Sequence, residues 1–110
     1  MQTTIQKELR ILMLEDSPDD AELNERELHK AGLQFTAQRV ESREAFSLAL
    51  KSFQPDLILS DYNLPGFSGI AALGIARHDC PEVPVIFVTG ALSDTEAANL
   101  MNAGAKDYVL

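Results

Sequence analysis

Acidic residues follow two apolar segments of the chain, at positions from which they could act together. Glu15 and Asp16 come directly after the apolar run 9–14, and Asp61 comes directly after the run 56–60. Carboxylates that lie close together repel one another and raise each other's pKa. A hard divalent cation relieves this repulsion, and Mg²⁺ fits best because it takes few carboxylates and keeps several waters. The three acids are therefore a candidate magnesium site if the fold brings the two runs side by side.

Each candidate residue also has a purely structural interpretation. Asp16 could be only an acid at a helix start, and Glu15 a solvated charge at the rim of a sheet. Asp61 is harder to explain in this way, because an apolar strand leads straight into an unpaired acid. Thr89 alone is typical of a strand-end hydroxyl, and Lys106 alone of a surface charge. It is the combination of these residues at strand ends that favours a functional site.

Short apolar runs alternate with helix signals along the whole chain. Strands are predicted at 9–14, 34–40, 56–60, 84–89 and 107–110. Helices are predicted after four serines that can cap them, namely Ser17, Ser42, Ser68 and Ser93, and the first and last of these helices end at Gly32 and Gly104. This alternation predicts an α/β fold with a flavodoxin-like, doubly wound, five-stranded parallel sheet in the order 2-1-3-4-5. In that order the first and third strands are neighbours, so their acids meet at one rim.

The predicted helices are too few to cover both faces of such a sheet. Four helices over five strands leave one face thinly covered, although parallel sheets are normally buried on both faces. We therefore expect one domain over 1–110, with 1–8 as a lead-in and with a final helix either beyond Leu110 or replaced by another chain. The apolar sheet surface left exposed would favour self-association or early melting.

The composition of the chain argues against several classes of protein. The chain has 110 residues, of which 45% are apolar, enough for one folded domain. Its net charge of -8 disfavours direct binding to nucleic-acid phosphates. The chain lacks both the roughly 18 consecutive apolar residues of a membrane span and a secretory signal, so we expect a cytoplasmic protein without membrane insertion. Cys80 is the only cysteine, which rules out an intramolecular disulfide.

Taken together, these residues resemble the receiver domain of two-component response regulators. The resemblance rests on five strand-end residues and on a short motif downstream of the central acid: Glu15, Asp16, Asp61, Thr89 and Lys106, with Leu64-Pro65-Gly66 and Gly69. It covers about 10–110. The family resemblance implies a phosphoprotein that takes part in its own phosphorylation and slow self-dephosphorylation, and is otherwise not an enzyme.

The resemblance also implies a role for each site residue. Asp61 would accept a phosphoryl group from a phosphohistidine of a sensor histidine kinase or histidine phosphotransfer protein. Asp16, Asp61 and the backbone carbonyl of Asn63 would hold Mg²⁺, with Glu15 acting partly through water.

Three further residues would read the phosphoryl group. Thr89 and Lys106 would bind its oxygens, and Tyr108 would then turn inward and change the output surface. The chain would belong to a response regulator or a hybrid kinase, with a possible output domain or self-association.

Three other interpretations of these residues are possible. A haloacid dehalogenase-type phosphatase needs a second acid two residues after its aspartate, but Asn63 occupies that place. A flavodoxin-like nucleotide or flavin carrier needs a glycine- or hydroxyl-rich loop after the first strand, where this chain has acids such as Glu15 and Asp19. The main alternative is a pseudo-receiver, a protein-interaction module that acts without phosphorylation.

Overall fold

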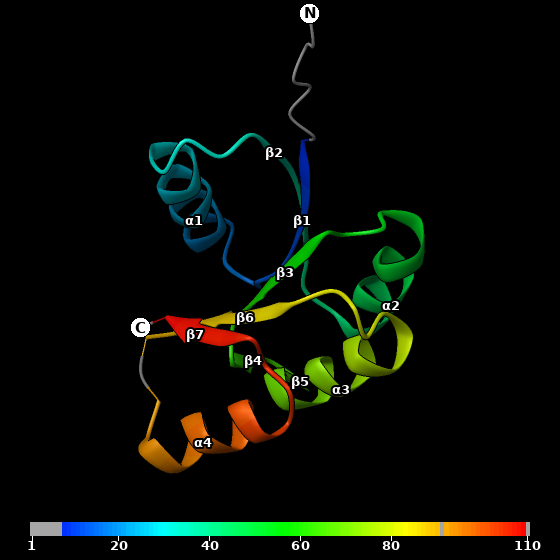
Figure 1. Cartoon of the computed structure of the whole chain (residues 1–110), viewed down its shortest axis with the longest axis vertical. Coiled ribbons are helices and arrows are strands. Elements are labelled where there is room, and N and C mark those ends of the chain that lie inside the picture. The colour runs from blue at the N-terminus through cyan, green and yellow to red at the C-terminus, as the bar shows by residue number, and fades with distance from the viewer. Residues whose placement is uncertain (1–7, 91, 110) are drawn as a thin grey trace, which may run out of the picture.

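The computed structural model describes residues 8–90 and 92–109 of the chain. Its centre is a sheet of five strands in the order β2-β1-β3-β6-β7, and all four neighbouring pairs are parallel. These strands are β1 (Leu9–Leu14), β2 (Phe35–Val40), β3 (Leu57–Ser60), β6 (Val85–Val88) and β7 (Asp107–Val109). The helices are α1 (Pro18–Lys30), α2 (Arg43–Ser52), α3 (Gly69–Asp79) and α4 (Asp94–Asn102), and Figure 1 shows them around the sheet. The predicted flavodoxin-like fold and strand order are confirmed.

The helix boundaries follow the capping residues that the sequence predicts. Four serines occupy the N-cap positions, and the hydroxyl of each accepts a hydrogen bond from the N–H three residues later: Ser17, Ser42, Ser68 and Ser93. Ser93 and Glu96 form a complete capping box at the start of α4. Gly32 and Gly104 have φ angles of 86° and 107°, the left-handed backbone that stops a helix at little cost only when the residue is glycine.

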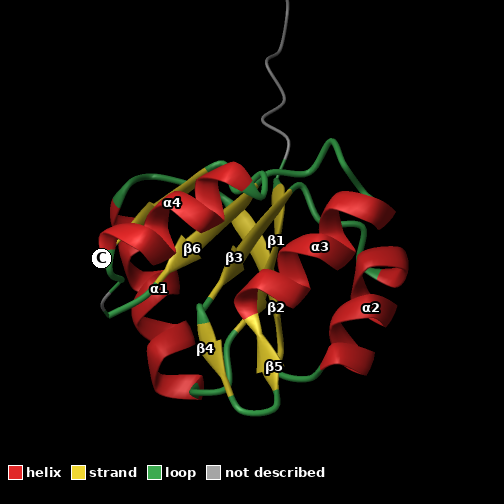
Figure 2. Cartoon of the chain, turned by 90° about the horizontal axis from the view of Figure 1, so that it is seen from below, coloured by secondary structure: helices red, strands yellow, loops and turns green. Residues whose placement is uncertain are grey.

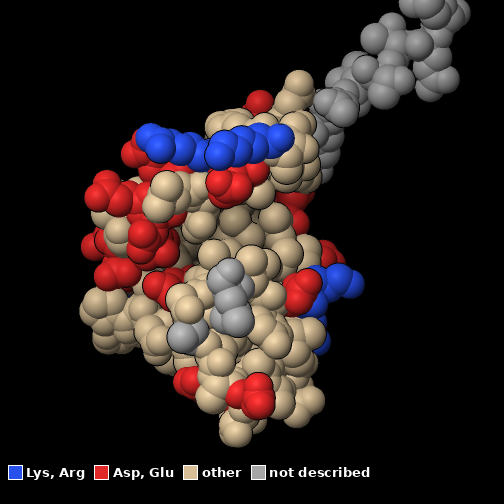
Figure 3. All heavy atoms as spheres, turned by 90° about the vertical axis from the view of Figure 1, so that its left-hand side faces the viewer, with Lys and Arg blue, Asp and Glu red and all other residues tan. Residues whose placement is uncertain are grey.

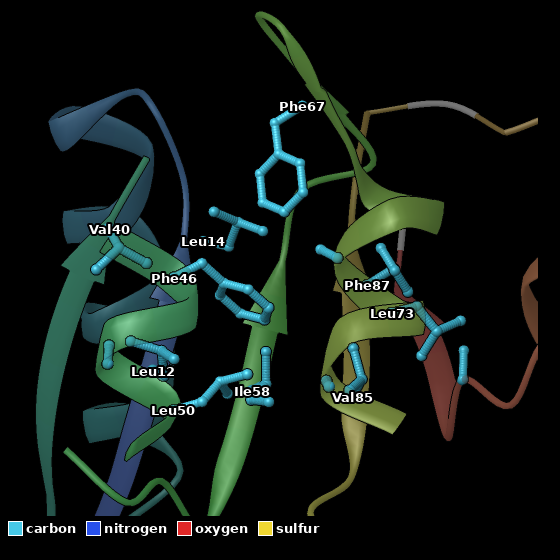
Figure 4. Packing of buried hydrophobic residues seen from close by; sticks show 14 of the residues in the cluster. Leu12, Leu14, Val40, Phe46, Leu50, Ile58, Phe67, Leu73, Val85 and Phe87 are labelled. Carbon is cyan, nitrogen blue, oxygen red and sulfur yellow. The ribbon is translucent and has the colours of Figure 1, made fainter. Parts of the chain in front are cut away.

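Alternate residues of the strands point to opposite faces of the sheet and form two separate cores. The larger core contains Leu12, Leu14, Ile58, Val85 and Phe87 of the strands, packed against side chains of α2, α3 and α4. Figure 4 shows Phe46 of α2 and Leu73 of α3 pointing into this core. The smaller core contains Ile11, Met13 and Leu59, packed against Ala21 and Leu28 of α1. Because both faces of β1 and β3 are covered, these strands are apolar along nearly their whole length.

A short hairpin after β3 was not predicted. It consists of β4 (Asn63–Leu64) and β5 (Phe67–Ser68), which pair antiparallel, and Figure 2 shows it projecting beyond the end of β3. Pro65 precedes Gly66, whose φ of 69° suits the third position of a type II turn. Phe67 anchors the hairpin, because its ring is buried and lies 6.0 Å from the Phe46 ring. Two-residue strands are too short to show a period in the sequence, so only the packing reveals them.

The face of the sheet that carries the smaller core is unevenly covered. Among the described helices, only α1 contributes side chains to that core. Ile86 and Val88 are half-buried on this side, and Val109 is 53% exposed. Figure 3 shows an uncharged surface beside the acidic side chains on this side of the molecule. The thin coverage agrees with the expected shortage of helices, and the final helix itself stays a prediction.

The termini of the predicted elements differ slightly from the observed ones. The strand expected at 84–89 is observed over Val85–Val88, so that Thr89 lies just beyond its end. The strand expected at 107–110 is observed over Asp107–Val109, and Leu110 lies outside the described residues. None of the helices in the described part of the chain is both long and apolar enough to span a membrane.

Candidate phosphoryl-transfer and metal site

The three predicted carboxylates lie together at the carboxyl ends of β1 and β3. One carboxylate oxygen from each of Glu15, Asp16 and Asp61 lies within 4.8 Å of the others. Backbone hydrogen bonds continue the sheet to this point, because the Asp61 N–H donates to the Leu14 carbonyl at 3.0 Å and the Glu15 N–H donates to the Val40 carbonyl at 3.0 Å. The sheet therefore places the acids from two separate segments at one rim, as the strand order predicts.

The environment of Glu15 favours a cation at this rim. Its side chain is almost fully buried, and this burial raises the pKa of Glu15 to about 7. The Ser17 N–H donates to Glu15 Oε2 at 3.1 Å and opposes the rise, whereas the carboxylates of Asp61, Asp16 and Asp20 add to it. A metal ion bound to these oxygens would offset the repulsion between them, so hard oxygen donors at this spacing fit Mg²⁺.

The segment after β3 turns back toward Asp61. The Asn63 N–H donates to Asp61 Oδ1 at 3.3 Å, so the main chain of Asn63 lies beside the carboxylate. The buried Ser60 hydroxyl donates to the Asp61 carbonyl at 2.8 Å and restrains the main chain at the same point. This arrangement leaves Asp61 half-buried, with a restrained backbone and an accessible side chain.

Thr89 reaches the same site from the next strand of the sheet. It is 7% exposed and follows β6 directly. A cleft of about 260 Å³ joins it to the acids, and the residues that line this cleft are Glu15, Asp20, Leu23, Asn24, Asp61, Val88, Thr89 and Gly90. The structure thus brings a hydroxyl and the carboxylate of Asp61 to one opening, as phosphoryl chemistry at Asp61 would require.

Lys106 does not belong to this site, and its predicted phosphate contact is wrong. It precedes β7, and its N–H donates to the carbonyl of Val85 at the start of β6. Thr89 lies four residues beyond Val85, about 13 Å along the strand at about 3.3 Å per residue. Lys106 instead lines a separate depression beside Arg77 at the amino ends of the strands.

Tyr108 lies on β7, one strand away from the acids. It pairs in register with Phe87 of β6, and its half-buried ring packs against the larger core. Thr89 follows Phe87 by two residues, which places both on the same side of the extended chain. Tyr108 is therefore a neighbour of the strand that carries Thr89, and it is not itself among the residues that line the cleft.

Three residues of α1 that line the cleft were not singled out from the sequence. Asp20, Leu23 and Asn24 line the cleft from α1. Asp20 stands in the first helical turn, where an acid is common for reasons of helix stability alone. Only the packing of α1 beside the rim shows that this face of the helix borders the acids.

A comparison with protein families identifies the chain as a whole. The family model of the response regulator receiver domain matches residues 11–110. The chain is 33% identical to the DNA-binding response regulator MtrA of Mycolicibacterium smegmatis over 101 residues, which are 92% of this chain and 43% of that protein. It is 41% identical over 86 residues to the DNA-binding transcriptional regulator NtrC of Salmonella typhimurium, covering 77% of this chain and 18% of that protein. The chain thus spans less than half the length of these relatives.

Solved structures give the same result. The signal receiver domain of a putative Luxo repressor protein from Vibrio parahaemolyticus superposes with a TM-score of 0.78 at 30% identity, over 94% of this chain and 78% of that one. The receiver domain of a sensor histidine kinase from Pseudomonas aeruginosa PAO1 superposes with a TM-score of 0.76 at 26% identity, over 94% of this chain and 84% of that one, and holds a magnesium ion in its active-site cleft. With the fold, the strand-end acids and these matches in agreement, the chain belongs to the response regulator receiver domain family.

Proposed function

We propose that this domain accepts a phosphoryl group on Asp61 in a magnesium-dependent reaction. The observation that carries the proposal is that carboxylate oxygens of Glu15, Asp16 and Asp61 lie within 4.8 Å of one another. Two of these acids, Glu15 and Asp61, line a cleft together with Thr89. The donor would be a phosphohistidine on a sensor histidine kinase or a histidine phosphotransfer protein, because membership of the family implies such a partner. The domain would thus take part in its own phosphorylation as the acceptor of the phosphoryl group.

The residues present suit a bound Mg²⁺. Asp16 and Asp61 would supply carboxylate oxygens, the backbone carbonyl of Asn63 a third oxygen, and Glu15 a contact partly through water. When bound, the ion would neutralise negative charge on the acids and on the oxygens of the incoming phosphoryl group. The raised pKa of Glu15 supports this assignment, because burial and, to a smaller extent, the neighbouring acids disfavour its charged form, and a bound cation would offset both.

The chain's own residues then account for the transfer. A carboxylate oxygen of Asp61 would attack the phosphorus in line with the N–P bond of the phosphohistidine. The O–P bond forms as the N–P bond breaks, and the imidazole of the donor leaves with the electron pair. The hydroxyl of Thr89 would donate a hydrogen bond to one phosphoryl oxygen. Lys106 takes no part, because it lies at the opposite ends of the strands.

The output would be a population shift between two packings of the surface near α4 and β7. Movement of Thr89 toward the phosphoryl group would pull the loop after β6, and the ring of Tyr108 could turn into the space that opens. We propose that the domain passes on this change through an output domain or by self-association. Two of its relatives are DNA-binding regulators.

The test is intact-mass measurement after incubation with acetyl phosphate, with and without Mg²⁺. We expect one added phosphoryl group in the presence of metal, and none in the Asp61→Asn variant. Asp79→Asn is a matched control, because it removes one carboxylate charge at the end of α3, far from the cleft. It should be modified like the natural chain.

The opposite result would favour the pseudo-receiver. If the folded chain gains no phosphoryl group under any of these conditions, Asp61 is not an acceptor and the domain acts through contacts alone. Circular dichroism on the same samples establishes that each variant is folded before its mass is compared.

A further inference from the structure

We propose that Arg39 is a positioning residue that orients the loop carrying Glu15 and Asp16 for metal binding. Arg39 lies near the carboxyl end of β2 and pairs in register with Met13 of β1. Its Nη1 atom donates to the backbone carbonyl of Glu15 at 3.1 Å and to Glu41 Oε2 at 2.7 Å. The inference rests on the proposed function, because it assigns a residue to the metal site proposed above.

The contact restrains the peptide group that leads into Asp16. The Glu15 N–H donates to the Val40 carbonyl, and the Glu15 carbonyl accepts from Arg39, so β2 holds the main chain of Glu15 at both its polar groups. The Glu15 carbonyl and the Asp16 N–H belong to one planar peptide unit. Restraining the carbonyl therefore restrains the peptide plane that leads into Asp16, which limits the directions in which its side chain can leave the main chain.

The guanidinium is well suited to this task. Its planar fork can hold two acceptors in fixed directions, and both of its bonds are charge-assisted. Glu41 anchors it from the segment after β2, and 34% of the Arg39 side chain stays exposed. Because Arg39 is bonded both to the Glu15 carbonyl and to Glu41, it can restrain the loop. Because its side chain is partly exposed, it adds little to the packing of the hydrophobic core.

The sign of one measurement separates positioning from simple electrostatics. Arg39 carries a positive charge close to a cluster of acids, so charge alone predicts that its removal tightens cation binding. Loss of positioning predicts the reverse, because groups that orient the ligands of a metal typically contribute about 10–100-fold to its affinity. The two explanations therefore differ in direction as well as in size.

The experiment titrates Mn²⁺ into the metal-free chain, followed by electron paramagnetic resonance of the free ion. We expect Arg39→Gln to weaken Mn²⁺ binding about tenfold, and Arg39→Lys to recover part of this loss because it keeps the charge and one donor. Arg26→Gln is the control, since it removes an arginine that pairs with Glu22 on the surface of α1, and it should change the affinity less than about twofold. Equal or tighter binding in Arg39→Gln would overturn the proposal.

A second measurement needs no metal. Hydrogen exchange at the amides of Glu15 and Ser17 reports the loop directly, because both amides are bonded within it or to β2. We expect these amides to exchange faster in Arg39→Gln and in Glu41→Gln, with the core of β3 unchanged. Unchanged exchange in both variants would overturn the proposal even if the natural chain binds metal. If the natural chain binds no Mn²⁺, the proposed function fails and the metal-binding role of Arg39 fails with it, and the exchange rates then show only whether Arg39 restrains the loop.

Discussion

The two ends of the same sheet have contrasting chemistry. At the carboxyl ends of the strands, Glu15, Asp16 and Asp61 lie within 4.8 Å of one another beside Thr89. At the amino ends, Arg77 and Lys106 line an open depression together with Glu82. In a parallel sheet every strand runs the same way, so a residue before a strand and a residue after it are separated by the full length of that strand. Position relative to strand direction thus decides which polar residues can share a site.

The largest expected effect is a difference in phosphorylation rate between variants at the two ends of the sheet. Asp16→Asn removes a proposed metal ligand at the carboxyl end and should lower magnesium-dependent phosphorylation by more than about 100-fold, since even groups that only orient metal ligands contribute about 10–100-fold. Lys106→Ala removes a cation at the amino end and should leave the rate within about twofold. The initial rate of phosphoryl incorporation from acetyl phosphate measures both. A large loss in Lys106→Ala would mean that the two ends act together.

The next effect concerns packing beside the cleft. Gly69 begins α3, and a Cβ atom added there would lie 2.7 Å from Cε1 of Phe87 and 3.0 Å from the backbone of Tyr62. Gly69→Ala should therefore lower the free energy of unfolding by about 1–3 kcal/mol, the usual cost of overpacking. Chemical denaturation measures the change. A variant as stable as the natural chain would show that this end of the sheet is more loosely packed than the contacts indicate.

A smaller effect depends on pH. Burial raises the pKa of Glu15 to about 7, so the folded chain holds this proton more tightly than the unfolded chain, whose value is near 4.5. The stability of the metal-free protein should therefore fall as pH rises from about 4.5 to 7, with the full loss present above pH 7. Glu15→Gln should remove this part of the fall and raise the melting temperature at pH 8 by on the order of 5 °C.

The control for the pH effect lies at the other end of the sheet. Glu82→Gln removes the same charge from an exposed position beside Pro81, and it should leave the fall between pH 4.5 and 7 as it is in the natural chain. If the proposed site binds Mg²⁺, addition of the ion at pH 8 should stabilise the natural chain, because a ligand that binds only the folded state shifts the equilibrium toward it. If Glu15→Gln and Glu82→Gln give the same pH profile, Glu15 is not the group responsible.

The smallest expected effect is stabilising and lies farther along α3. Nothing lies within 4 Å of a Cβ atom added at Gly74, which is exposed in the middle of the helix. Gly74→Ala should raise the free energy of unfolding by about 0.5–1 kcal/mol, because alanine favours the helix more than glycine does. Compared with Gly69→Ala, the opposite sign would confirm that the start of α3 has no room for a side chain, whereas position 74 faces solvent. Thermal denaturation of both variants measures the difference.

Most of the fold could be predicted because its signals are local. Strand ends follow apolar runs, and helix starts follow serines whose hydroxyls cap the next turn, as Ser93 and Glu96 do. The β4–β5 hairpin escaped prediction because two-residue strands carry no period, and Phe67 is held there by packing on Phe46. Local signals identify elements, whereas short pairings depend on contacts between them.

For the candidate site, the sequence predicted where the acids lie but placed Lys106 wrongly. The strand-end positions of Glu15, Asp16 and Asp61 follow from their places after apolar runs. Lys106 was assigned from a resemblance, although its place before a strand puts it at the opposite end of a parallel sheet. The direction of the strands alone was sufficient to exclude it.

The sequence by itself determined the α/β class, the order of elements and the presence of acids where two strands end. These properties depend on residue type and on spacing within short segments, which hydrophobic periodicity and capping express directly. Only the tertiary structure decided that Arg39 meets the Glu15 carbonyl and that Asp20 borders the cleft. Those contacts depend on strand register and on the way α1 packs beside the rim. Both are set when side chains that are far apart in the sequence become buried in the same core.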